Sequence, residues 1–303
     1  MAHPTRKRGV QWINVKSVTL RRVVQLREQF KLLSERDLKE CLPPLQRPKC
    51  VARDGYYFMV LLFPWFDRER HAVTTEEVDV FILKDTIITL HANHIPIFEE
   101  LEAELRSGRS KDFFVDNSTN HVLDILERLL DYCAPIIVHL QNDIDEQEHF
   151  VQEHFKESEI IRTALLRRNV VSFGRGFSPN VHVLDQFRKE SASHMSRDTK
   201  IRLDHIYDKA EEIAVLLADF ASAISHIHET QQALVTHRTN RATTALSVVA
   251  TLTFPLSMIA AVFGMGAIGT PLVQQENGFL IIALGLATLG IAMLAFFKWR
   301  RWF

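Results

Sequence analysis

Formal charge is almost absent from the last fifth of this 303-residue chain. The 56 residues from Ala242 to Phe297 carry one charge, Glu276, whereas Asp, Glu, Lys and Arg make up 24% of the whole chain. A helix on the surface of a soluble protein keeps polar residues on its outer face. The missing charge therefore argues against a purely soluble protein, and a buried hairpin in a large soluble core is the alternative.

Other absences narrow the class of function. The net charge of −1 gives no basic excess, so we expect no nucleic-acid partner. Three cysteines without a Cys-x-x-Cys spacing exclude a disulfide scaffold and a zinc knuckle, and they are typical of a reducing compartment. No apolar stretch follows the basic N-terminus, so we expect no cleaved signal peptide. Phosphate-binding glycine loops and Gly-x-Ser-x-Gly elbows are also missing, so we expect neither an enzyme nor a bound organic cofactor.

Two apolar segments, 242–264 and 279–297, are each long enough to cross a bilayer as a helix. The connecting segment, 265–278, contains no Lys or Arg. Basic residues flank the far ends of both spans, and the tail 298–303 is basic. By the positive-inside rule we expect a multi-pass protein of the cell inner membrane with both termini in the cytosol and an external loop. The flanking basic residues are Arg238, Arg241, Lys298, Arg300 and Arg301.

No Gly or Pro occurs between Asn180 and Phe254. This predicts a long helix, with a stalk over 180–241 that continues into the first span and is kinked at Pro255. Apolar residues recur at alternating spacings of four and three, which is typical of a coiled coil or a helical bundle. This seam comprises Ile206, Ala210, Ile213, Leu217, Phe220, Ile224, Ile227, Gln231 and Leu234.

The first 118 residues have the pattern of a cytosolic α/β domain. Strands are expected at 12–15, 56–63, 78–83 and 86–91, and helices at 23–30 and 35–42. Residues 119–179 are expected to form an acidic helical hairpin. Its carboxylates are either a solvated helix face or a reservoir for divalent cations.

The chain resembles the CorA-type magnesium transporters, a family that includes the ZntB zinc transporters. The resemblance covers essentially the full length. It rests on Gln46-Arg-Pro-Lys49, on Glu76-Glu-Val-Asp-Val-Phe, and on Pro255-Leu-Ser-Met-Ile-Ala-Ala-Val-Phe-Gly-Met. It implies a homopentameric funnel that carries Mg²⁺, with Co²⁺ and Ni²⁺ as companions, through a channel gated by cytosolic metal.

The resemblance also implies roles for individual residues of the first span. The family's Gly-Met-Asn reads Gly264-Met265-Gly266 here, so the amide that would ring the pore mouth is missing and Glu276 is the one charge left in the loop. Leu246 and Phe254 fall at the hydrophobic constriction. The remaining pore positions are Asn240 and Glu229 near the cytosolic entrance, with Ala250, Ser257 and Ala261 on the same face.

The hydroxyls of the first span leave two interpretations open, since small polar residues either line a pore or mediate helix packing. They are Thr243, Thr244, Ser247, Thr251, Thr253 and Ser257.

His205 stands where magnesium-type members carry an Asp of a regulatory metal site. Together with Asp204 and Asp208 it is a candidate regulatory site, and its imidazole favours zinc over magnesium. A solvated histidine is the alternative, and the pairs His91/His94 and His226/His228 are weaker metal candidates. Two other functions stay open: proton-coupled zinc transport of the ZntB kind, and a non-conducting metal sensor with the same fold.

Overall fold

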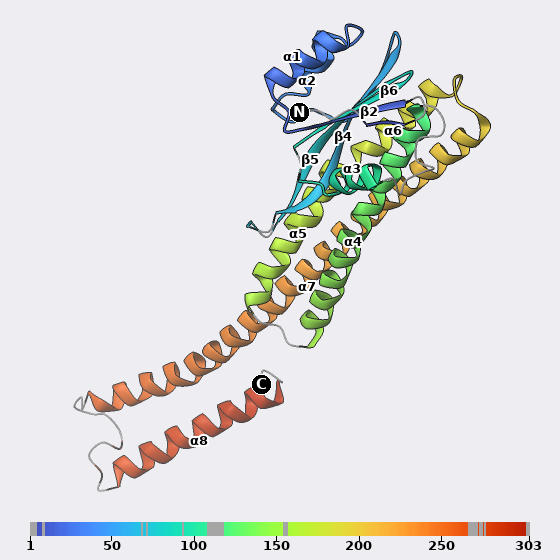
Figure 1. Ribbon diagram of the computed structural model, residues 1–303. Helices are drawn as coiled ribbons and strands as arrows, with labels where there is room; N and C mark the ends of the chain where they lie inside the picture. The colour runs from blue at the N-terminus through green and yellow to red at the C-terminus, as the bar shows by residue number, and fades with distance from the viewer. Residues whose placement is uncertain are drawn as a thin grey trace. The chain divides into compact units, whose positions relative to one another are not determined.

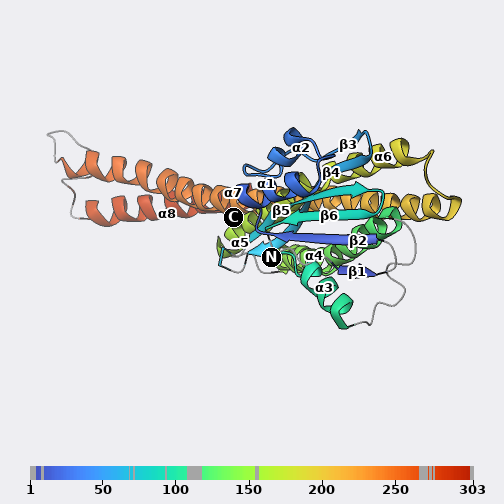
Figure 2. The same cartoon turned by 45° about the horizontal axis from the view of Figure 1, so that its top comes forward.

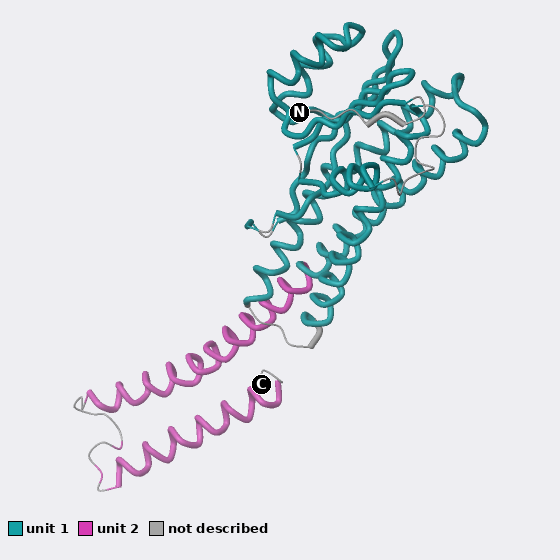
Figure 3. The backbone as a smooth tube through the Cα atoms, in the orientation of Figure 1, with its two compact units in different colours: residues 1–228 teal, residues 229–303 magenta. Residues whose placement is uncertain are grey.

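The computed structural model describes residues 5–7, 10–67, 69–70, 72–92, 94–107, 118–153, 157–265, 272, 275 and 277–300. The chain divides into two compact units, Met1–His228 and Glu229–Phe303, which Figure 3 distinguishes by colour. Each unit is described by itself.

A six-stranded mixed sheet forms the centre of the first unit (Figures 1 and 2). The strand order is β1-β2-β6-β5-β4-β3. Strand β2 pairs parallel with β6, and the other neighbours are antiparallel. Strand β4 is a near-continuous apolar run and β5 is apolar from Val80 to Leu83, because helices cover both faces of the sheet. The strands are β1 (Thr5–Lys7), β2 (Val10–Lys16), β3 (Lys49–Arg53), β4 (Tyr56–Asp67), β5 (Ala72–Leu83) and β6 (Thr86–His91).

Helices α1 (Leu20–Gln29) and α2 (Glu35–Glu40) cover one face of the sheet, and their Val23, Leu26 and Leu38 are buried in one cluster with strand residues such as Phe58 and Phe81. The other face carries α3 (Ile97–Ser107), α4 (Ser118–Glu153), α5 (Glu157–Phe177) and α6 (Pro179–Ser191). Aromatic pairs such as Phe63 with Phe177 join the sheet to these helices, with ring centroids 6.1 Å apart.

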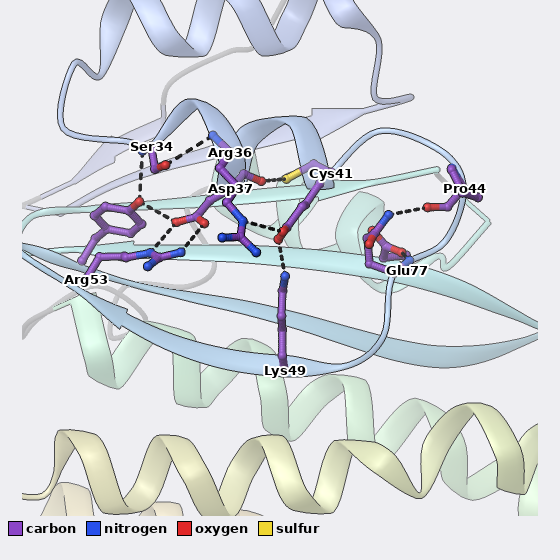
Figure 4. Close-up of polar contacts among 11 residues, drawn as sticks. Ser34, Arg36, Asp37, Cys41, Pro44, Lys49, Arg53 and Glu77 are labelled. Atoms are coloured by element: carbon purple, nitrogen blue, oxygen red, sulfur yellow. Dashed lines mark hydrogen bonds and ion pairs between the residues drawn. The ribbon is translucent and has the colours of Figure 1, made fainter.

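A buried carboxylate fastens α2 to the sheet (Figure 4). Asp37 is 1% exposed and accepts hydrogen bonds from Arg53 Nε at 2.9 Å, Arg53 Nη2 at 2.7 Å and the Tyr56 hydroxyl at 2.7 Å. Burial alone would raise the pKa of Asp37, but the hydrogen bonds from Arg53 and Tyr56 outweigh it and lower that pKa. Arg53 and Tyr56 are register partners across the Asp54-Gly55 turn, in which Gly55 has φ +88°.

The long helix expected over 180–241 is interrupted. Helix α6 ends at Ser191, and α7 runs from Arg197 to Gly264 with Pro255 inside it. The break needs no Gly or Pro because Ser196 caps the new helix: its Oγ accepts the Thr199 amide at 3.2 Å. The Thr199 hydroxyl in turn donates to Asn120 Oδ1 on α4 at 3.0 Å, which fixes the start of α7.

The seam of α7 is buried within a single chain. From Ile206 to Ile227 its apolar members are at most 8% exposed. Helices α4 and α5 cover it: Lys209 pairs with Asp131 of α4, and a Cβ built at Gly174 of α5 would lie 3.8 Å from Leu217 Cβ. The seam therefore belongs to an intrachain helical bundle, one of the two structures that its spacing predicted.

The strands at 12–15, 56–63, 78–83 and 86–91 and both early helices are confirmed. The sequence patterns missed β1, β3 and α3. Strand β3 is five residues with an exposed C-terminal end, and α3 follows a short break after β6.

We predict that Gly176→Ala destabilises the protein, since a Cβ at this position would lie 2.1 Å from Thr75 Cγ2 on β5. Forced overpacking of this kind costs about 1–3 kcal/mol. Thermal unfolding of the purified full chain, followed by tryptophan fluorescence, measures the effect. Gly174→Ala is the matched control, because its Cβ makes ordinary contact at 3.8 Å. Equal melting temperatures for the two variants would contradict the close packing of α5 on β5.

A second prediction concerns the seam. Ile213→Asp places a charge where the side chain is 5% exposed, so it should lower the stability of the helical bundle by several kcal/mol. Val215→Asp, two residues along the same helix at a position 55% exposed, should leave stability nearly unchanged. Chemical denaturation of both variants tests this. If the two substitutions were equally tolerated, the seam would not be packed against α4 and α5.

Candidate functional site

The second unit contains α7 from Glu229 to Gly264, which carries no charged residue from Ala242 onward, and helix α8 (Gly278–Trp299). Both helices are long and apolar enough to cross a membrane. This agrees with the expected spans at 242–264 and 279–297. Pro255 lies inside α7 and does not end it.

One face of this part of α7 is covered. Val248 is 1% exposed, and Leu252, Leu256 and Ile259 are partly covered. Helix α8 supplies the contact: a Cβ built at Gly290 would lie 3.6 Å from Leu256 Cδ1. A glycine at the contact lets two membrane helices approach closely, which is how helices associate without a hydrophobic driving force.

The opposite face is open along its whole length. Exposed residues recur along this face at spacings of three and four. Each covered residue follows an exposed one by two positions in the sequence, which is a rotation of about 200° around the helix. Leu246, Phe254 and Met265 are 71%, 78% and 73% exposed. We call this set the open stripe: Asn240, Thr243, Leu246, Ala250, Phe254, Ser257, Ala261 and Met265.

The expected pore residues thus share one face of α7 as far as the structure describes them. Gly264 and Met265 end the helix, and Met265 N donates to Ala261 O at 3.1 Å. Glu229 is exposed. Gly266, Glu276 and Arg301 lie outside the described residues, so the variant tripeptide and the loop charge remain predictions. Lys298 and Arg300 are exposed beside Trp299 at the end of α8.

Four of the six hydroxyls of the first span can be assigned to one of two arrangements. Thr251 and Thr253 donate to the carbonyls of Ser247 and Val249, four residues back, at 2.7 and 2.8 Å. Such bonds satisfy the hydroxyl within its own helix. Thr243 and Ser257 are the two hydroxyls that belong to the open stripe.

Asp204, His205 and Asp208 are exposed on the first unit's part of α7. Asp204 pairs with Arg188 of α6 at 3.3 Å, and the Arg188 guanidinium stacks on Tyr207, 4.4 Å from the ring centroid. Within the described ranges no three His, Cys, Asp or Glu side chains of one chain are placed to hold a metal ion. Asp204, His205 and Asp208 thus form no such group within one chain, and their regulatory role remains a prediction.

The acidic residues of α4 and α5 include close ion pairs, among them Glu146 Oε2 with Arg162 Nη2 at 2.6 Å. Glu146 is therefore paired with an arginine of its own chain, which favours a solvated helix face over a cation reservoir at this position. Sequence patterns did not single out the buried carboxylates Glu77 and Asp79 of β5. Acidic residues inside an apolar strand were the available signal.

These features define a membrane protein with two candidate spans, an α/β domain and an uncharged helix with one face open. The chain belongs to the family described as CorA-like Mg2+ transporter protein, whose model matches residues 7–301. The resemblance seen in the sequence is thereby confirmed.

Two relatives place the chain within this family. It is 23% identical over 292 residues to the cobalt/magnesium transport protein CorA of Thermotoga maritima, covering 96% of this chain and 83% of the relative. It is 24% identical over 228 residues to the zinc transport protein ZntB of Pectobacterium atrosepticum, covering 74% and 67%.

Solved structures share the fold. The complete CorA magnesium transporter of Methanocaldococcus jannaschii matches with a TM-score of 0.83 at 16% identity, covering 96% of this chain and 90% of that one. The full-length CmaX protein matches with a TM-score of 0.73 at 18% identity, covering 97% and 88%.

Proposed function

We propose that this protein is a channel for divalent cations, with Mg²⁺ as the main substrate and Co²⁺ and Ni²⁺ as further ones. The observation that carries the proposal is the open stripe of α7, which is uncharged from Asn240 to Met265 and exposed along one face of a membrane helix. Family membership over residues 7–301 and the cobalt/magnesium transporter among its relatives support the choice of ions.

The stripe requires several copies of the chain. One helix cannot enclose a path for an ion, and side chains such as Leu246 and Phe254 are open in a single subunit. We propose a homopentamer in which five copies of the open stripe surround the axis. The covered face of α7 packs on α8, so α8 forms the outer, lipid-facing layer.

The stripe also assigns roles along the path. Asn240 offers amide oxygens near the entrance, where hard cations prefer oxygen ligands. Leu246 and Phe254 form narrow apolar rings that close the path when water leaves them. At the far end Gly266 has no side chain, so backbone carbonyls and the Met265 position replace the amide ring of the family. We infer weaker discrimination among divalent cations at this mouth.

We place the protein in the cell inner membrane with both termini in the cytosol. Lys298 and Arg300 beside the amphipathic Trp299 support this orientation, since basic residues accumulate on the cytosolic side and aromatic residues at the interface. The α/β domain is then cytosolic and can respond to the internal metal concentration.

We assign regulation to Asp204, His205 and Asp208, which need ligands from a neighbouring subunit to complete a site. His205 favours a second candidate function, zinc transport coupled to protons, because imidazole binds zinc better than magnesium. The ZntB relatives support this alternative.

Uptake of ions into proteoliposomes tests the proposal. We predict Mg²⁺ entry without an imposed pH gradient, and its loss in Ala250→Trp, which fills the open stripe. Val249→Trp is the control, since Val249 is 61% exposed but lies off the stripe. Zinc entry accelerated by a pH gradient would instead support the ZntB-like function. No entry of either ion from a verified oligomer would overturn transport in favour of a non-conducting sensor.

Replacing His205 by Ala tests the regulatory site. Losing a partner of a metal ligand alone costs about 10–100-fold in affinity, so we predict that the internal metal concentration for half-inhibition rises at least about tenfold. The control is His182→Ala, which removes an exposed histidine of α6. An unchanged dose response in His205→Ala would return this residue to a solvated helix face.

A further inference from the structure

A cavity of about 480 Å³ lies in the α/β domain where β5 extends past the end of β6. The last β5–β6 pair is Val78 with His91, so residues 72–77 of β5 have no strand beside them on that edge. The cavity lies beside this unpaired part of β5 and extends to Pro43 and Pro44, in the segment that follows α2.

Two carboxyl groups on one face of β5 line the cavity. Asp79 is 2% exposed and Glu77 is 8% exposed. The Glu77 carboxylate accepts the backbone amide of Gln46 and lies beside Pro44 (Figure 4). Asp79 Oδ1 has no hydrogen-bond partner among the described residues, and neither has Thr74 Oγ1, whose residue also lines the cavity. An unsatisfied buried acceptor costs about 1–3 kcal/mol, and more when it is charged.

Neither carboxyl group forms a salt bridge with a basic side chain among the described residues, and the charge of Lys49 acts on both only from a distance. Lys49 bonds to Glu40, and Arg70 pairs with Asp67. Burial raises the pKa of Asp79 well above its ordinary value, and the charge of Glu77 raises it further. Burial also raises the pKa of Glu77. A bound cation would remove this repulsion.

The third acid of the cavity is already paired. Glu76 Oε2 accepts the His94 amide at 2.9 Å, and the two oxygens lie 3.5 and 3.2 Å from Nδ1 of His91 and His94. His91 Nε2 contacts Asn14 Oδ1 at 2.9 Å, and the His94 ring stacks on Trp65. The imidazole nitrogens nearest the cavity are therefore engaged, which leaves the carboxyl groups of Glu77 and Asp79 to bind a ligand.

Most of the remaining lining is apolar, and the cavity is large enough for an organic molecule. The apolar part is formed by Val18, Pro43, Pro44, Leu45, Trp65 and Leu90, and the other members are Cys41, Arg70, Thr75 and Ala92. Small-molecule sites have this composition, with mostly apolar walls and a few polar groups that orient the ligand. A hydrated metal ion gains nothing from such walls, whereas an alkyl chain does.

We propose that this cavity binds a primary aliphatic ammonium ion. The ammonium group donates hydrogen bonds to Asp79 and Glu77 at the floor of the cavity. The alkyl chain lies against Leu45, Trp65 and the two prolines. This ligand differs from the transported ions, so the site stands independently of the proposed channel.

Calorimetric titration of the full-length protein with 1,4-diaminobutane tests the proposal. We expect one amine per subunit, and a loss of at least about tenfold in affinity in Asp79→Asn, because a charge-assisted hydrogen bond contributes about 1.5–3 kcal/mol. Asp54→Asn is the matched control, as it removes an exposed acid in the turn between β3 and β4. Tetramethylammonium, a cation without N–H donors, should not bind.

A second variant separates binding from folding. Ala92 lies on the exposed rim of the cavity, so Ala92→Trp should block the amine while leaving both carboxyl groups and the thermal stability unchanged. Equal amine affinity in the wild type, Asp79→Asn and Ala92→Trp would overturn the proposal. Binding of Mg²⁺ or Zn²⁺, lost in Asp79→Asn and unaffected by the amine, would do so as well and would identify a metal site.

Discussion

The apolar side chains of helix α7 are buried within the chain in its first half and exposed in its second half, and the proposed function depends on this difference. Up to Ile227 its apolar seam is satisfied inside one chain, because α4 and α5 bury it. In the second unit α8 contacts α7 at Leu256, and large apolar side chains such as Phe254 stay open. Unburied apolar surface of this extent is stable in lipid or against other copies of the chain. One helix therefore connects a self-sufficient bundle with a surface that requires partners.

The α/β domain contains buried acidic side chains that are fully hydrogen-bonded and one, Asp79, that is not. The carboxylate of Asp37 is held by Arg53 and Tyr56, so burial costs little there and α2 is fixed to the sheet. Glu76 is likewise paired with two histidines. Asp79 keeps one oxygen without a hydrogen-bond partner in the part of the domain that the structure describes, and this residue lines a cavity. Because the other buried acids of this domain have partners, we infer that the partner of Asp79 is a ligand.

Much of this architecture could be predicted from the sequence, because it follows from local periodicity. The apolar runs of β4 to β6, the missing charge of both spans and the spacing along α7 all recur at short range. The break at residues 192–196 escaped prediction, since a serine cap formed by Ser196 replaces the expected Gly or Pro. The helices that cover the seam could not be predicted, because the spacing of apolar residues shows that one face is buried but not which helix buries it. The cavity beside Asp79 depends on where β6 stops relative to β5, which is a long-range property of the sheet.

The most direct test of the central claim is a cysteine scan of α7 with a charged thiol reagent during ion flux. The three native thiols of Cys41, Cys50 and Cys133 are buried, and burial raises the pKa of Cys50 to about 12, so they should not react. We predict that cysteines at Thr243, Leu246, Ala250, Ser257 and Ala261 lose flux on modification. Cysteines at Val248, Leu252 and Leu256 should be unaffected. Equal sensitivity of both faces, or sensitivity of the covered face alone, would contradict the assignment of the open stripe to the ion path.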